Sequence, residues 1–160
     1  MFDRIKENLS RQGKAMVLLR VLLEEEFSRL LERDSKGVSP IELSLQELMR
    51  QLVKERLSLA ELIQAGSNGA CRRVREVMPG MQPEQAEDLG QLLVDLDELE
   101  QSCARQAACN QQLSLALYEQ SRQLLEFMHE RIKPTKLEGY SAKGKYANKA
   151  GESVLVRGTL

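Results

Sequence analysis

A long, uninterrupted run of helical apolar spacing limits what this chain can fold into. From about Glu84 to Ile132 apolar residues recur at intervals of three and four, and neither proline nor glycine occurs between Gly90 and Pro134. A seam sustained over so many turns indicates coiled-coil packing of long helices rather than a compact globule. The seam consists of Leu89, Leu92, Leu96, Leu99, Cys103, Ala107, Asn110, Leu113, Leu117, Leu124 and Met128.

Two earlier segments follow the same rhythm. Over residues 2–30 the apolar side chains form one helical face that only Gln12 interrupts, and the segment stops near Gly37. The next segment opens at Ser39-Pro40-Ile41-Glu42, which combines an N-cap serine, a proline at the first helical position and a glutamate three residues after the cap. This capping box predicts a second long helix, which ends at the glycine-containing stretch 65–69.

A short helical piece from Cys71 to Met78 follows, and the segment Pro79 to Pro83 ends it because its prolines and glycine break a helix. We therefore predict the all-α class, as an elongated antiparallel bundle of long helices with coiled-coil-like packing over residues 1–133. At 1.5 Å per residue the first helix spans about 45 Å and the last about 70 Å. The end of the last helix, Leu117 to Ile132, should then project beyond its neighbours and expose apolar residues.

Residues 134–160 form a polar tail rich in glycine and lysine, which we expect to be flexible. The tail holds five Lys or Arg against two Asp or Glu, a net charge of +3, and the whole chain has a net charge of −1. The first 133 residues therefore carry −4. This near balance requires neither a nucleic-acid partner nor a membrane, and no apolar stretch approaches the roughly 20 residues of a membrane span. The amino terminus has no signal-peptide core, so we expect a cytoplasmic protein.

No catalytic or metal-binding pattern emerges, so we expect a protein that is not an enzyme and needs no cofactor or metal. Cys71, Cys103 and Cys109 form no CxxC pair and are expected to be small, buried or half-buried thiols in a reducing compartment. The only histidine, His129, is expected to be solvated or at the edge of the seam. The cluster Arg72, Arg73 and Arg75 has no stacking aromatic residue nearby, which makes it a weak nucleic-acid signal.

Asn110 is the polar residue of the long seam. It falls between Ala107 and Leu113, where an amide lowers stability but can fix the alignment of packed helices. We therefore predict that Asn110 sets the register of the seam.

The order of several short motifs resembles the FlgN family of flagellar export chaperones over essentially the full chain. These motifs are Asn110-Gln-Gln-Leu113, Leu124-Leu-Glu-Phe-Met128, Lys133-Pro134 and the tail sequence Tyr140-Ser-Ala-Lys-Gly144, which has the form Tyr-x-Ala-x-Gly. The resemblance implies a cytoplasmic, non-enzymatic chaperone. Such a protein binds the C-terminal amphipathic helices of hook-filament junction proteins, prevents their premature polymerisation and delivers them to the flagellar type III export gate.

The resemblance also implies two sites. Client binding maps onto the end of the long helix, at Leu113, Leu117, Leu124, Phe127, Met128 and Ile132. Docking at the export gate maps onto Tyr140 and Gly144 of the tail, whereas residues 151–160 receive no role. An independent reason for the first site is that an exposed apolar stripe can cover a client's amphipathic helix.

A second interpretation comes from another class of protein. The apolar seams can also pair with copies of the same chain, which would make the protein a structural coiled-coil adaptor or a homo-oligomerisation module, for example a homodimer. This alternative predicts that the apolar residues from Leu117 to Met128 are buried between copies whether or not a client is present.

Overall fold

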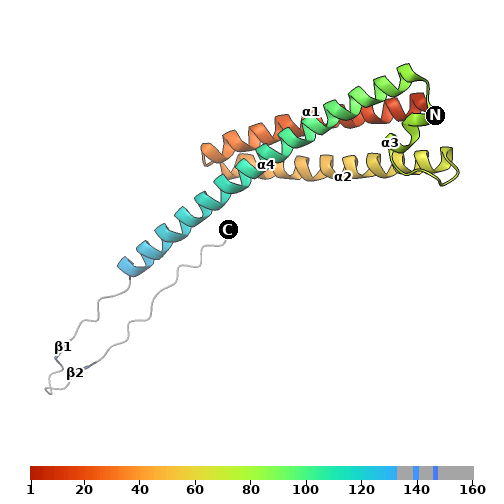
Figure 1. The fold of residues 1–160 in the computed structure, drawn as a ribbon. Helices are drawn as coiled ribbons and strands as arrows, with labels where there is room; N and C mark the ends of the chain where they lie inside the picture. Colours follow the sequence, from red (N-terminus) through yellow and green to blue (C-terminus); the bar gives the residue numbers. More distant parts are fainter. Residues whose placement is uncertain (133–138, 141–145, 148–160) are drawn as a thin grey trace. The chain divides into compact units, whose positions relative to one another are not determined.

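The computed structural model describes residues 1–132, 139–140 and 146–147, and four α-helices account for most of them (Figure 1). The elements, in chain order, are α1 (Phe2–Leu31), α2 (Ser35–Gly66), α3 (Val74–Val77), the 3-10 helix η1 (Met78–Gly80), α4 (Pro83–Ile132), β1 (Gly139–Tyr140) and β2 (Tyr146–Ala147). The predicted all-α bundle of long helices is confirmed. The chain divides into two compact units, Met1–Ser114 and Leu115–Leu160.

Helices α1 and α2 form an antiparallel hairpin with a three-residue connection, Glu32 to Asp34. The predicted apolar face of α1 packs against α2 because both helices repeat aliphatic residues every three or four positions. The buried residues of this contact are Ile5, Leu9, Met16, Leu19 and Leu23 from α1 and Leu48, Leu52, Leu59 and Ile63 from α2.

The start of α2 differs from the prediction, because the capping box at Ser39 does not form. Asp34 is the N-cap instead, and its carboxylate accepts the backbone N–H of Gly37 at 3.0 Å. Gly37 thus lies in the first turn of α2 rather than ending the previous helix. Ser39 donates its hydroxyl back to the Ser35 carbonyl at 3.3 Å, and Pro40 lies inside the helix, where it costs one backbone donor.

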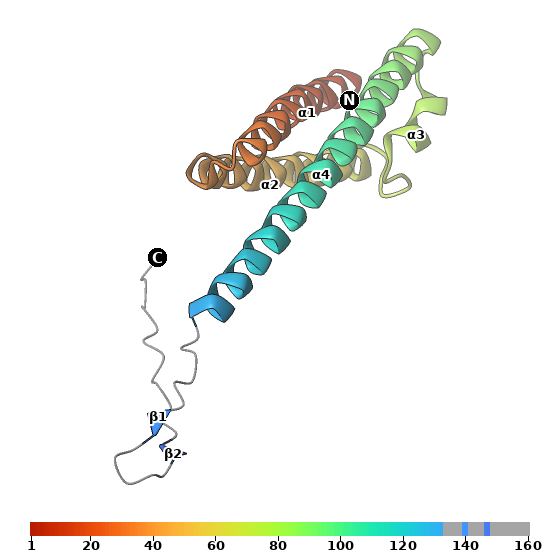
Figure 2. The ribbon, with the colours of Figure 1, turned by 90° about the vertical axis from the view of Figure 1, so that its left-hand side faces the viewer.

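The first part of α4 completes the bundle within the first unit. Leu89 packs in one cluster with Ile5, the Cys103 thiol lies 3.6 Å from the Met16 carbonyl, and Asn110 bonds to Leu23. Since both series of residue numbers increase together, α4 runs parallel to α1 and antiparallel to α2, as an up-down-up bundle requires. Figures 1 and 2 show α3 at the same end of the bundle as the N-terminus, beside the end of α2 and the start of α4.

The core of this unit consists of two apolar clusters with a polar layer between them. One cluster contains Ile5, Leu9, Leu59, Ile63, Val74 and Leu89, and the other contains Met16, Leu19, Leu23, Leu48, Leu52 and Cys103. Between them Gln12 donates to Asn8 at 2.6 Å, and Asn8 donates to the Glu55 carboxylate at 2.8 Å. The interruption predicted at Gln12 is therefore a buried hydrogen-bonded network between α1 and α2.

The tail contributes one short antiparallel pair, in which Gly139 of β1 lies opposite Ala147 of β2 and Tyr140 lies opposite Tyr146. This pairing was not predicted. The rest of the tail expected to be flexible lies outside the described residues, so its flexibility stays a prediction. The division of the chain after residue 133 also stays a prediction.

Candidate protein-binding surfaces

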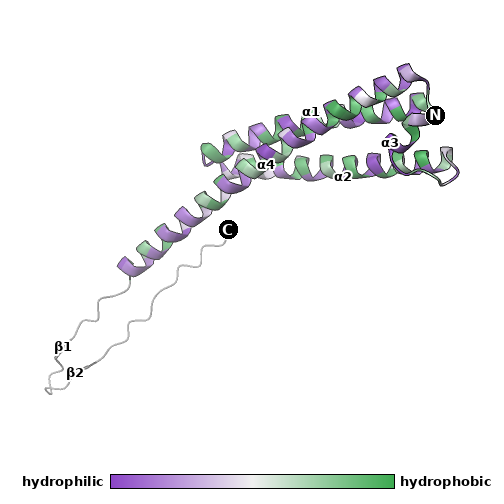
Figure 3. Ribbon diagram, viewed as in Figure 1, coloured by the Kyte–Doolittle hydropathy of each residue, from purple (hydrophilic) through white to green (hydrophobic). Residues whose placement is uncertain are grey.

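The C-terminal part of α4 exposes large apolar side chains along one side of the helix. Leu124 is 59% exposed, Phe127 53% and Ile132 72%, and Leu125 and Met128 are also exposed. Leu113 and Leu117, the other predicted client contacts, are half-buried. Figure 3 shows hydrophobic residues recurring among hydrophilic ones along this stretch. We call Leu117, Leu124, Phe127, Met128 and Ile132 the α4 stripe.

The stripe continues a seven-residue series that begins in the core. The three buried residues of α4 are Leu89, Cys103 and Asn110. Their spacings are multiples of seven, and the next members of this series are Leu117 and Leu124. Because seven residues make almost two turns, each step of this series turns only about 20° around α4. The sequence pattern that buries the first half of the helix is therefore repeated in a half whose apolar residues are largely exposed.

Local contacts support the helix around the stripe. Arg122 bonds to Glu119 at 2.8 Å and to Glu126 at 3.0 Å, one turn away in each direction. These carboxylates raise the pKa of Arg122, with the hydrogen bond to Glu119 as the largest cause. The Arg131 guanidinium lies 4.8 Å from the centre of the Phe127 ring, at cation–π distance. The apolar side chains of the stripe therefore alternate with charged side chains that are hydrated.

Two exposed apolar residues of the same stretch were missed by the sequence analysis. Leu115 and Tyr118 are more exposed than Leu124, but they lie outside the seven-residue series. Leu115 is two residues from Leu117, about 200° around the helix. It therefore belongs to the opposite side of α4, and a search restricted to the seam could not find it.

Asn110 is buried, with 4% of its surface exposed, and it joins α4 to α1. Its side-chain nitrogen donates to the Leu23 carbonyl at 2.8 Å and to the Glu26 carboxylate at 2.7 Å. Its oxygen accepts a hydrogen bond from Gln106 at 3.0 Å. These bonds can all form only when α4 and α1 have one particular alignment. This is the geometry that a register residue needs.

The tail residues are only partly described. Tyr140 lies in β1, opposite Tyr146, and Gly144 lies outside the described residues. The docking role of Tyr140 and Gly144 stays a prediction.

An apolar groove in the first unit was also missed. It encloses about 390 Å³ between the three long helices. The exposed side chains of Met49 and Val53 line its α2 wall, and Ala104 and Ala107 line its α4 wall. The ion pair between Arg56 and Glu100, at 3.0 Å, lies at one end. The sequence signal that could have revealed this groove is the pair Met49 and Val53, which are four residues apart and each follow a buried leucine of α2.

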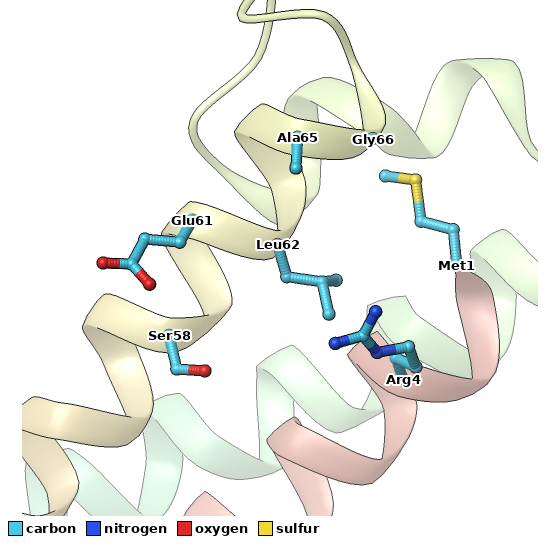
Figure 4. A pocket seen from close by; sticks show the side chains of 7 residues that line it. All are labelled: Met1, Arg4, Ser58, Glu61, Leu62, Ala65 and Gly66. Atoms are coloured by element: carbon cyan, nitrogen blue, oxygen red, sulfur yellow. The ribbon is translucent and has the colours of Figure 1, made fainter.

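Another hollow, of about 510 Å³, lies between the start of α1 and the end of α2. Figure 4 shows the Arg4 side chain reaching toward Leu62, while the Glu61 carboxylate points away from the hollow. The lining also contains Ser58, but its hydroxyl makes no hydrogen bond to the Glu61 carboxylate that could activate it. This arrangement gives no catalytic constellation.

Two further kinds of site are absent from the described part of the chain. No group of three or more His, Cys, Asp or Glu side chains there is arranged to hold a metal ion. No described helix contains an apolar stretch suited to crossing a bilayer.

Comparison with known proteins identifies the family. A family model described as FlgN protein matches residues 1–148. Comparison with curated proteins and with solved structures gives no match. The matched region contains all four helices, the α4 stripe and the tail motif that carried the resemblance. Because the match covers most of the chain, the protein belongs to the FlgN family of flagellar export chaperones.

Proposed function

We propose that this chaperone works in the cytoplasm and binds the C-terminal amphipathic helices of hook-filament junction proteins. The observation that carries the proposal is the α4 stripe, whose apolar side chains are about half exposed or more from Leu124 to Ile132. A junction protein that polymerises through terminal helices exposes a matching apolar face while it is monomeric. Helix-on-helix packing would cover both faces and prevent polymerisation.

The expected affinity is moderate. Full burial of one Leu, Phe, Met or Ile side chain contributes about 1.5–3 kcal/mol. Because Leu124, Phe127, Met128 and Ile132 are already partly covered, burial of their exposed parts contributes roughly 3–7 kcal/mol, to which the client's own apolar face adds. Loss of translational and rotational freedom costs about 4–15 kcal/mol, which offsets much of this gain. A complex with a small net free energy can release its client at the export gate.

Delivery is the second part of the proposal, and the tail motif supports it. Tyr140 is an aromatic residue with a polar hydroxyl, the kind of side chain that anchors in a receptor pocket. We infer that Tyr140 and Gly144 bind an export-gate component. The expected consequence is that Tyr140→Ala weakens binding to that component and leaves client binding unchanged. Loss of client affinity in Tyr140→Ala would instead place the tyrosine in the client site.

Calorimetric titration with each junction protein, with and without its terminal helix, tests client binding directly. Leu124→Asp and Phe127→Asp place a charge in the stripe and should abolish binding. Leu115→Asp is the matched control, because it places the same charge on the opposite side of the same helix. Met49→Asp tests the apolar groove of the first unit. If Met49→Asp abolishes binding and Leu124→Asp does not, the client site is the groove and the proposal for the stripe is wrong.

The adaptor interpretation is tested with the same variants. Sedimentation of the chain without a client would show an oligomer that Leu124→Asp dissociates. If client binding then survives in Leu124→Asp, the stripe serves self-association and not client capture.

A further inference from the structure

A cavity of about 560 Å³ lies in the first unit, near the end where α3 connects α2 to α4. Aliphatic side chains from three helices line it, among them Leu59, Ile63, Leu93 and Leu96. Arg72, Arg73 and Arg75 of the α2–α4 connection line the same cavity. An aliphatic hollow and a group of cations thus lie within one small site.

The sequence around α3 explains why the arginines gather there. Val74 is buried in the apolar cluster and holds the connection against the bundle. Its neighbours Arg73 and Arg75 are therefore left at the surface on either side, and Arg72 precedes them. Glu76 fixes the backbone by accepting the N–H groups of Arg72 at 2.8 Å and Arg73 at 3.2 Å.

These three guanidinium groups lack a salt-bridge partner of their own. Within the described residues no carboxylate lies within 4.0 Å of the side-chain nitrogens of Arg72, Arg73 or Arg75, whereas Arg56 on the same cavity pairs with Glu100 at 3.0 Å. Glu76 uses a carboxylate oxygen for the backbone of the connection. The site therefore has a surplus of positive charge in a unit that is acidic as a whole.

We propose that this cavity and its arginine rim bind an acidic amphipathic peptide segment of a partner protein, at a site separate from the α4 stripe. One apolar side chain of the segment enters the aliphatic hollow, and its carboxylates accept hydrogen bonds from the rim. Arginine suits this role because its planar group binds a carboxylate through two parallel N–H donors. None of the described residues that line the cavity is aromatic and could stack on a base, which favours a peptide over RNA.

The probe is a short fluorescein-labelled peptide with leucines on one helical face and glutamates on the other, titrated with the full chain by fluorescence anisotropy. The triple variant R72E/R73E/R75E should weaken its binding by about tenfold or more. The matched control K36E/K54E/R105E makes the same change in net charge at exposed lysines and an arginine outside the cavity. It should leave the affinity within about twofold.

Two further measurements distinguish the contribution of the aliphatic hollow to peptide binding from that of the arginine charges. Ala60→Phe fills the cavity from its α2 wall and should weaken binding, while circular dichroism confirms an unchanged helical fold. A peptide with lysine in place of every glutamate should not bind. Equal weakening in the two charge-reversal triples would overturn the proposal. So would tighter binding of a single-stranded RNA through the same arginines, or a loss of peptide binding in Leu124→Asp with none in the arginine variant.

Discussion

Replacement of Asn110 by alanine should destabilise the bundle by an amount that the structure allows us to estimate. The change removes a hydrogen bond to the Leu23 carbonyl, worth about 1 kcal/mol, and one to the Glu26 carboxylate, worth about 1.5–3 kcal/mol. Two effects offset part of this loss. Alanine has a helix propensity better by about 0.5 kcal/mol, and the half-buried Glu26 can bind water instead. We expect a net loss of about 2 kcal/mol.

The assay is urea unfolding of the full chain followed by circular dichroism, with the free energy of unfolding extrapolated to water. Gln112→Ala is the control, because it makes the same kind of change at an exposed position two residues away and should cost less than about 0.5 kcal/mol. A double-mutant cycle with Glu26→Ala isolates the bond between the two side chains. We expect a coupling energy of about 1 kcal/mol.

Asn110→Leu provides the opposite test. Leucine restores an apolar residue to the seam and should recover much of the stability that alanine loses, but it no longer specifies the alignment of α4 with α1. A thiol crosslink between cysteines introduced at matched positions of the two helices would report that alignment. An Asn110→Ala variant as stable as the wild type, or a cycle with no coupling, would refute the register argument.

Three further results are expected. Gly37→Ala should lower stability by about 1 kcal/mol although alanine favours helices, because its Cβ would lie only 2.9 Å from Asp34 Cγ and displace the N-cap; an increase in thermal stability would contradict this. Cys109 is exposed, contrary to the sequence prediction, whereas burial raises the pKa of the Cys103 thiol, so Ellman's reagent should modify Cys109 first and Cys103 only after unfolding. The N–H groups bonded to Glu76 lower its pKa, so the stability that it contributes at neutral pH is lost as the pH falls through that lowered value. Glu76→Gln should therefore lower the free energy of unfolding at about pH 7 but not at about pH 2.

The long helices were predictable because the physical signals along them agree. Helix α4 begins within one residue of the predicted start and ends at Ile132, because proline limits both ends and nothing between Gly90 and Pro134 breaks it. The interruption at Gln12 was also visible, since a polar residue stands out in an apolar series. Its partners Asn8 and Glu55 were not, because the hydrogen bonds depend on how α1 and α2 align.

Errors occurred where two local signals compete for the same residues. Gly37 resembles a helix end, and Ser39 resembles a cap, but the Asp34 carboxylate reaches the Gly37 N–H and starts α2 earlier. The piece predicted over residues 71–78 is shorter as α3 because Glu76 binds the backbone of Arg72 and Arg73 outside the helix. In both places one carboxylate decides the boundary, and spacing alone does not show which donors it reaches.

Surfaces could be predicted from the sequence only where they lie on a single helix. The α4 stripe could be predicted because it lies on one helix and needs only periodicity. The groove at Met49 and Val53 and the arginine-rimmed cavity are each built by several elements. No property of a single segment reveals them, because they exist only once the helices have packed.

Two of the hydrogen-bonded contacts between the helices also suggest an order of folding during synthesis. The layer of Asn8, Gln12 and Glu55 uses only the hairpin of α1 and α2, so it can lock as soon as both helices have left the ribosome. The contact of Asn110 with Leu23 requires residues made much later. We expect the hairpin of α1 and α2 to form first and to act as a template on which α4 aligns once it has been synthesised.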